Sequence, residues 1–181
     1  MIDHDIDAAA EEAAHTGGLA VMGVTISFVG ATTEELDRAE KDPNWADDCV
    51  SELYGQDYPK PDRPYGGPDK AFGGLQFLFD EAETSLEFVM DGFQIRDDGT
   101  LFGWTAEQID SVARELRATP WERLAAHYDA ERMGKQDVYP NMWRFDPEGQ
   151  LEWLEGAYEE LVEFFGAAAD RGLGAFMTFS F

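Results

Sequence analysis

The amino-acid sequence predicts an α+β fold, in which helices pack on a small mixed or antiparallel sheet. Several segments have apolar residues at helical spacing, and a residue typical of a helix N-cap precedes each of them. An Asp98-Gly99 pair separates two short alternating runs, and the chain ends in an apolar run over 174–181. A chain of 181 residues, 44% of them hydrophobic, is long enough to bury a core without disulfide or metal cross-links.

We expect the chain to divide into an extension over 1–21, flexible or weakly helical over 8–14, and a single domain over 22–181. The extension is rich in Ala, Glu and Asp, a composition that does not favour a packed terminus. After Met22-Gly23, the run at 24–29 predicts a strand. Thr32 and Glu35 then form a capping-box pattern that predicts a helix, and Pro43 ends it. We expect a short helix over 47–54 and a long loop over 55–68. The aromatic residues of this region, Trp45, Tyr54, Tyr58 and Tyr65, either cover the edge of the core or line the mouth of a binding site.

The next helix is predicted from Asp69, as its cap, to about residue 80. Phe72, Leu75 and Phe79 lie on one face of it. Gln76 lies in the middle of that face, so its amide must find hydrogen-bond partners or destabilise the fold by about 1–3 kcal/mol. Two glycines at 73 and 74 disfavour the helix, and they allow another element to approach closely.

The middle of the chain predicts a hairpin and two further helices. The runs at 93–96 and 100–104 flank an Asp-Gly turn, which is typical of a hairpin. Thr105, with Gln108 three residues later, caps a helix. Thr119, followed by Pro120, predicts a cap and first position for the next helix.

A long helix and a terminal strand close the predicted fold. The helix begins at Asp146-Pro147, runs to about residue 170 and stops at Gly172. The following run, 174–181, is so apolar that we expect a paired and buried strand.

One side of that long helix is acidic. At 100° per residue, its apolar residues cover one half of the circumference, and the other half carries glutamates without any base. These residues are Glu148, Glu152, Glu155, Glu159, Glu160 and Glu163. Their neighbouring like charges destabilise the helix by on the order of 1–2.5 kcal/mol at low salt. The face is solvated, meets a basic protein, or binds a divalent cation; we predict an acidic partner face at Glu152, Glu155, Glu159 and Glu163.

The net charge of −25 restricts the possible partners. Such a field repels nucleic acids and anionic lipid, and it favours cationic partners, divalent ions or life at high salt. The alternative is that the acidic surface only keeps the protein in solution. The single cysteine, Cys49, excludes an internal disulfide and a cysteine zinc site. No apolar run is long enough to span a membrane, and the acidic N-terminus is unlike a signal peptide, so we expect a cytoplasmic protein.

A second candidate site is a pocket formed by Lys70, Gln76, Tyr139 and Trp143. Ammonium, amide, phenol and indole groups beside aromatic residues are able to hold a small molecule. The alternative is an ordinary core, in which Tyr139-Pro140 fixes a turn and Trp143 packs beneath it.

The sequence resembles the YfbM-like family, a bacterial domain of unknown function. The matching features are Met22-Gly23 with its strand, the run Asp69-Lys70-Ala71-Phe72 with its helix, and Tyr139-Pro140 followed by Trp143. The Thr105 helix, the segment from Leu124 to Tyr128, and the closing helix and strand occur in the same order. The resemblance covers about 22–181, and it implies a compact α+β fold without an established activity. Family members usually carry Trp and then histidines on the Asp-Lys-Ala helix, where this chain has Phe72, Gly73 and Gln76.

No nucleophile elbow, phosphate-binding loop or metalloprotease motif is present. The sequence predicts no catalytic residues, no metal site and no cofactor. We therefore expect a non-enzymatic acidic binding protein, one form of which is an immunity-type or antitoxin-like protein that neutralises a basic toxin. The alternative is a small-molecule-binding protein or enzyme that uses the Lys70 and Tyr139 region. A third interpretation is adaptation to salt without a specific partner.

Overall fold

The computed structural model describes residues 23–55, 63–87 and 92–181. The extension predicted over 1–21, the start at Met22 and most of the predicted long loop lie outside these residues. Within them, five antiparallel strands form an open sheet in the order β2-β1-β5-β4-β3. The strands are β1 (Thr25–Ala31), β2 (Tyr65–Asp69), β3 (Phe93–Gln94), β4 (Leu101–Trp104) and β5 (Gly174–Ser180).

The last strand of the chain lies in the middle of this sheet. β5 pairs with β1 along its whole length, from Ala31 opposite Gly174 to Thr25 opposite Ser180. Its other edge pairs with β4, where Trp104 lies opposite Ala175. The prediction that the terminal apolar run is paired and buried is therefore confirmed.

The sheet is covered on both faces, because successive residues of a strand point to opposite sides. Phe28 of β1 and Met177 of β5 belong to the larger apolar core. Their neighbours Val29 and Phe176 belong to the smaller one. Each central strand is therefore apolar on both faces.

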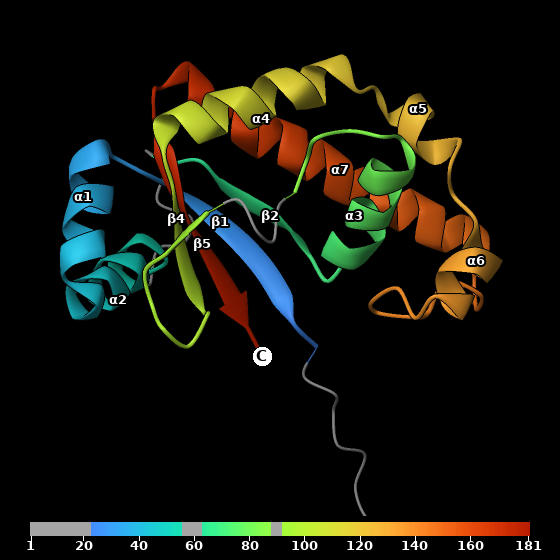
Figure 1. Cartoon of the computed structure of the whole chain (residues 1–181), viewed down its shortest axis with the longest axis horizontal. Coiled ribbons are helices and arrows are strands. Elements are labelled where there is room, and N and C mark those ends of the chain that lie inside the picture. Colours follow the sequence, from blue (N-terminus) through green and yellow to red (C-terminus); the bar gives the residue numbers. More distant parts are fainter. Residues whose placement is uncertain (1–22, 56–62, 88–91) are drawn as a thin grey trace, which may run out of the picture.

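Two helices cover the smaller core. α1 (Thr33–Lys41) begins with the predicted capping box of Thr32 and Glu35. α2 (Pro43–Leu53) follows it directly, with Asp42 as its cap. Pro43 thus does end the first helix, but it also opens the second, which begins four residues before the predicted start at 47. Figure 1 shows α1 and α2 together on one side of the sheet.

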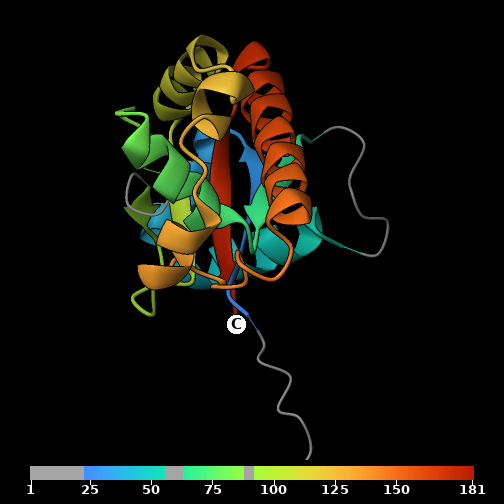
Figure 2. The same ribbon diagram turned by 90° about the vertical axis from the view of Figure 1, so that its right-hand side faces the viewer.

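The remaining helices form the other layer. They are α3 (Phe72–Glu81), α4 (Ala106–Ala118), α5 (Trp121–Ala125), α6 (Ala130–Lys135) and α7 (Pro147–Asp170). Figure 2 shows α7 running beside the sheet for most of the length of the molecule. The predicted ends of α7, at Asp146-Pro147 and before Gly172, are confirmed. The capping box of Thr105 and Gln108 is confirmed at the start of α4.

Three local predictions were wrong. Residues 65–69 form the edge strand β2 rather than part of a loop, although the segment contains Gly66, Gly67 and Pro68. Asp69 ends that strand with a φ of 47°, and α3 begins after Ala71 without a side-chain cap.

The third error concerns Thr119. It ends α4, and Pro120 precedes α5 without a capping hydrogen bond. The backbone N–H of Thr119 donates to the carbonyl of Leu116, so this threonine continues the end of the preceding helix.

Candidate functional site

The predicted acidic face of α7 lies on the side of the helix away from its buried residues, and Glu160 lies at the edge of that face, toward β2. Leu154, Leu161 and Phe165 are fully buried on its inner side. Five of the glutamates are exposed and Glu155 is partly exposed. Within the described ranges, none of the six forms an ion pair. Arg117 of α4 lines a hollow beside Glu159 and Glu163, but its ion pair is with Asp170.

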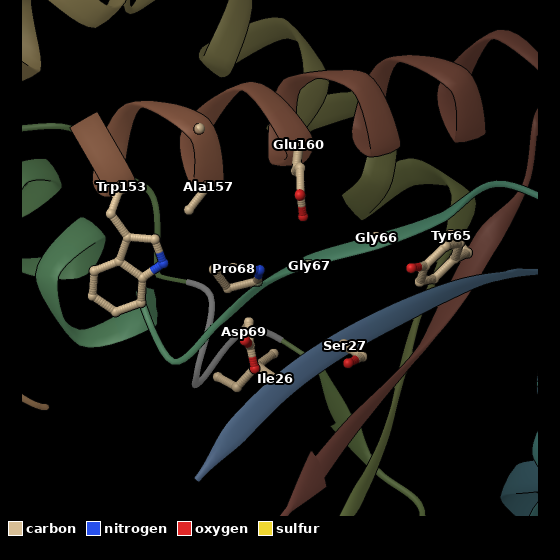
Figure 3. A pocket seen from close by; sticks show the side chains of 11 residues that line it. Ile26, Ser27, Tyr65, Gly66, Gly67, Pro68, Asp69, Trp153, Ala157 and Glu160 are labelled. Atoms are coloured by element: carbon tan, nitrogen blue, oxygen red, sulfur yellow. The ribbon is translucent and has the colours of Figure 1, made fainter. Parts of the chain in front are cut away.

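A pocket of about 430 Å³ lies between α7 and β2, and we call it the α7–β2 pocket. On the helix it is lined by Trp153, Gly156, Ala157 and Glu160, which share one flank at spacings of three and four residues. The opposite wall is formed by β2 from Tyr65 to Asp69, together with Ile26 and Ser27 of β1. Figure 3 shows Glu160 and Trp153 projecting from α7 toward β2.

Glycines line both walls of this pocket. Gly156 is in the interior of α7, and a Cβ placed there would meet nothing within 4 Å. Across the pocket, Gly67 lies so close to β1 that a Cβ would come within 2.6 Å of the Ile26 carbonyl oxygen. The glycine thus permits the close pairing of β2 with β1, and the pocket floor carries no bulky side chain at this point.

The α7–β2 pocket has acidic and neutral walls. Asp69 and Glu160 contribute carboxylates, while Ser27 and Tyr65 contribute hydroxyl groups. Its described lining residues include no Lys, Arg or His. The indole of Trp153 is stacked on that of the fully buried Trp143, with ring centroids 6.0 Å apart. The pocket therefore suits a neutral or positively charged group.

A second cavity, of about 530 Å³, lies beside Tyr139, and we call it the Tyr139 pocket. Lys70 and Tyr139, both predicted site residues, line it. The other lining residues are Gly23, Pro140, Met142, Gln150 and Trp153. Trp153 thus borders both cavities, and the consecutive residues Asp69 and Lys70 belong to different ones.

Tyr139 is held in a fixed orientation. Its hydroxyl group donates to the carbonyl of Val24 over 3.0 Å, and its ring stacks on Phe72 with centroids 5.0 Å apart. The peptide bond to Pro140 is cis. Burial raises the pKa of Tyr139, and so does the charge of Asp69, whereas the hydrogen bond to Val24 lowers it. The phenol is consequently neutral near pH 7.

The other two predicted pocket residues do not line this cavity. Gln76 donates to the Asp80 carboxylate and to the carbonyl of Leu86, both over 2.8 Å, so its amide has the partners that its position requires. Trp143 is fully buried, and its indole N–H donates to the carbonyl of Val138 over 2.7 Å. Lys70 and Tyr139 are thus brought together, while Trp143 packs behind the cavity wall formed by Trp153.

The described part of the chain contains no group of three or more His, Cys, Asp or Glu side chains arranged to hold a metal ion. None of its helices is both long enough and apolar enough to cross a membrane.

Sequence reasoning missed the α7–β2 pocket. One signal was present: Gly156 interrupts a long helix between Trp153 and Glu160, where a better helix former would be expected. The other wall is formed by a Gly-Gly-Pro strand that the sequence pattern did not predict. The sequence therefore did not indicate that this segment and α7 lie on opposite sides of one pocket.

Comparisons with known proteins agree with the resemblance seen in the sequence. A family model described as a domain of unknown function, DUF1877, matches residues 22–178. The fold is similar to the crystal structure of YfbM from Escherichia coli, a protein of unknown function, with a TM-score of 0.63. The two share 12% sequence identity, and the match covers 86% of this chain and 99% of that chain. No curated protein matches the sequence. The family model spans most of the chain, which therefore belongs to the DUF1877 family.

Proposed function

We propose that this chain is a binding protein whose partner is a basic protein, held by the acidic face of α7. That face consists of Glu152, Glu155, Glu159 and Glu163. The observation that carries the proposal is that these carboxylates project to solvent from one helix with no described base paired to them. Neutralising a basic toxin, in the manner of an immunity protein, is one form of this function.

Electrostatic physics supports this choice of partner. Neighbouring glutamates repel one another and destabilise the helix. A cationic partner surface would attract each of them and offset that repulsion. A net charge of −25 accelerates the encounter with a positively charged partner, and such steering weakens steeply as salt is added.

The test is capture from native lysate at low salt, with the full chain as bait. A variant with glutamine at all four positions of the acidic face is compared with a matched control. The control, Glu34→Gln, Glu40→Gln, Asp48→Asn and Glu52→Gln, changes the net charge equally on exposed positions of α1 and α2.

We expect one basic protein to be retained by the native chain and by the control and lost from the α7 variant. Its purified form should bind with an affinity that falls as salt rises. Equal retention by the two variants would show that only the overall charge matters, and the proposal would then fail.

A second candidate function is small-molecule binding in the Tyr139 pocket. The favouring observation is a cavity of about 530 Å³ with an ammonium group, an amide and two aromatic rings on its walls, which is within the size range of small-molecule sites. Lys70→Met keeps the aliphatic stem and removes the charge. A metabolite that raises the Tm of the native chain should do so less in this variant; an equal shift in both would place its binding elsewhere.

A further inference from the structure

We propose that the α7–β2 pocket is a receptor for a single alkylguanidinium or alkylammonium group. All of its lining residues lie outside the two predicted sites, although Trp153 also borders the Tyr139 pocket. This assignment deepens the proposed function, because an arginine or lysine side chain of the basic partner is one source of such a group; a free polyamine is the other.

The first argument is charge. Asp69 from the end of β2 and Glu160 from α7 line one cavity. Neither carboxylate forms an ion pair with another described residue. An anion would meet two like charges there, whereas a cation would supply hydrogen-bond donors to both walls.

The second argument distinguishes an organic cation from a metal ion. Calcium is usually held by six to eight oxygen ligands, and the described residues supply no cluster of three candidate side chains. The pocket instead combines two carboxylates with an indole and the apolar side chain of Ala157. A cation on an aliphatic stem uses both, because an indole attracts a cation placed over its face.

The third argument is that the indole is fixed in place. Trp153 is stacked on Trp143, which is itself fully buried and hydrogen-bonded to Val138. An aromatic wall that does not have to be ordered on binding favours affinity. Asp69, with a φ of 47°, is likewise held at a defined place by the strand pairing opposite Ile26.

The test uses 1-propylguanidinium and its neutral isostere N-propylurea as probes of the full-length chain. The indole N–H resonance of Trp153, assigned with Trp153→Phe, reports binding. We expect a saturable shift with propylguanidinium and none with propylurea. Equal shifts with both probes would overturn the proposal, because they would show that the positive charge is not recognised.

Variants separate the pocket from the general acidic field. Gly156→Leu adds a bulky side chain to the helix wall of the pocket without changing any charge. Its Cβ enters open space, so the fold should persist and binding should be lost. Glu160→Gln and Asp69→Asn should each weaken binding about three- to tenfold; asparagine tolerates the positive φ of position 69. Glu40→Gln, on α1, should have little effect. Undiminished binding to a folded Gly156→Leu protein would refute the assignment.

Two further ligands distinguish the sources of the cation. One is spermidine; the other is a lysine-rich peptide with one arginine, compared with the same peptide carrying citrulline there. Tighter binding of the arginine peptide, dependent on both Gly156 and the α7 glutamates, would support a protein partner. Tighter binding of spermidine would support the pocket while contradicting the proposed function. A basic partner that still binds Gly156→Leu with full affinity would leave the proposed function intact and eliminate the pocket as its anchor.

Discussion

At the scale of single residues, glycines determine how closely the elements of this fold approach one another. Gly73 and Gly74 of α3 face the segment from Tyr139 to Trp143, which is one of those that resemble the YfbM-like family. A Cβ on Gly73 would come within 2.6 Å of the Tyr139 carbonyl oxygen, and a Cβ on Gly74 would overlap the Trp143 ring. The prediction that these glycines admit a neighbouring element is confirmed, and the element is the Tyr139–Trp143 segment.

Gly74→Ala should therefore destabilise the protein. Alanine is favoured over glycine in a helix by about 1 kcal/mol, but overpacking against the buried Trp143 and Leu154 opposes this gain by about 1–3 kcal/mol. We expect a lower unfolding midpoint in urea.

Gly156→Ala is the matched comparison, since its added methyl group meets nothing within 4 Å. It should raise the unfolding free energy by about 0.5–1 kcal/mol. Stabilisation by both alanines would contradict the packing described for α3.

A second residue-scale prediction concerns Tyr54 at the end of α2. Burial raises its pKa to about 12, although its hydrogen bond with Thr178 acts in the opposite direction. An unfolded tyrosine ionises near pH 10. Between these values the unfolded chain loses a proton that the native chain retains, so stability falls as pH rises, by up to about 1.4 kcal/mol per pH unit.

Tyr54→Phe removes this contribution. The unfolding free energy of the variant should therefore decline less steeply between pH 10 and pH 12 than that of the native chain. Tyrosinate absorbance provides an independent readout, because the substitution should remove a tyrosine that ionises near the upper end of that range. Identical pH slopes for the two proteins would mean that Tyr54 ionises normally in the fold.

At the scale of elements, local signals predicted most of what the structure contains. The ends of α7 were predicted from Asp146, Pro147 and Gly172, because caps and stops act within a few residues of the sequence. The same holds for the capping boxes of α1 and α4. The prediction was wrong where a tertiary contact determines the local structure. Aspartate is a common capping residue, yet Asp69 pairs with Ile26 and ends a strand.

The candidate site was less predictable than the fold for the same reason. Lys70 and Tyr139 could be placed together because both belong to the segments that carry the family resemblance. The walls of the α7–β2 pocket come from two glycine-containing segments about ninety residues apart, Gly66-Gly67 and Gly156. Such a hollow exists only once β2 pairs with β1 and α7 packs beside it.

At the scale of elements, the acidic face of α7 predicts how a charge reversal changes the stability of the protein. Glu155 has like-charged neighbours three residues before it and four residues after it, Glu152 and Glu159. Glu155→Lys exchanges two repulsions for two attractions, so it should stabilise the protein by roughly 1 kcal/mol at low salt. The gain should shrink as added salt screens the charges. Chemical denaturation at two salt concentrations measures it.

Glu34→Lys is the control for this substitution. Glu34 lies in the first turn of α1, where an acid is favoured by the helix dipole, and its pairs with Asp37 and Arg38 offset each other. The same change should therefore destabilise the protein by about 0.3–1 kcal/mol. If Glu155→Lys were also destabilising, repulsion between neighbouring glutamates would not be the main effect of charge on the stability of α7. If Glu155→Lys stabilises the protein, the fold does not require the glutamates of this face. Residues that are kept at a cost in stability are expected on a binding surface.

At the scale of the whole molecule, two features combine: a core complete on both sides of the sheet and a net charge of −25. The central position of β5, paired on both edges, makes the end of the chain essential to the sheet. The charge acts against this compact state through self-repulsion. How stability responds to different salts therefore reveals whether the acidic surface acts as a diffuse field or as a set of ion sites.

We expect a diffuse response. Because the described residues form no cluster of three metal-binding side chains, MgCl₂ or CaCl₂ should raise the Tm no more than KCl does at equal ionic strength. Most of the rise should occur below a few tenths molar, since screening at about 0.1 M already limits charge interactions to about 10 Å. Stabilisation by millimolar divalent ion would instead indicate a carboxylate site on α7. A Tm that continued to climb in molar KCl would identify the surface as an adaptation to salt, and would remove the main reason to expect a basic partner.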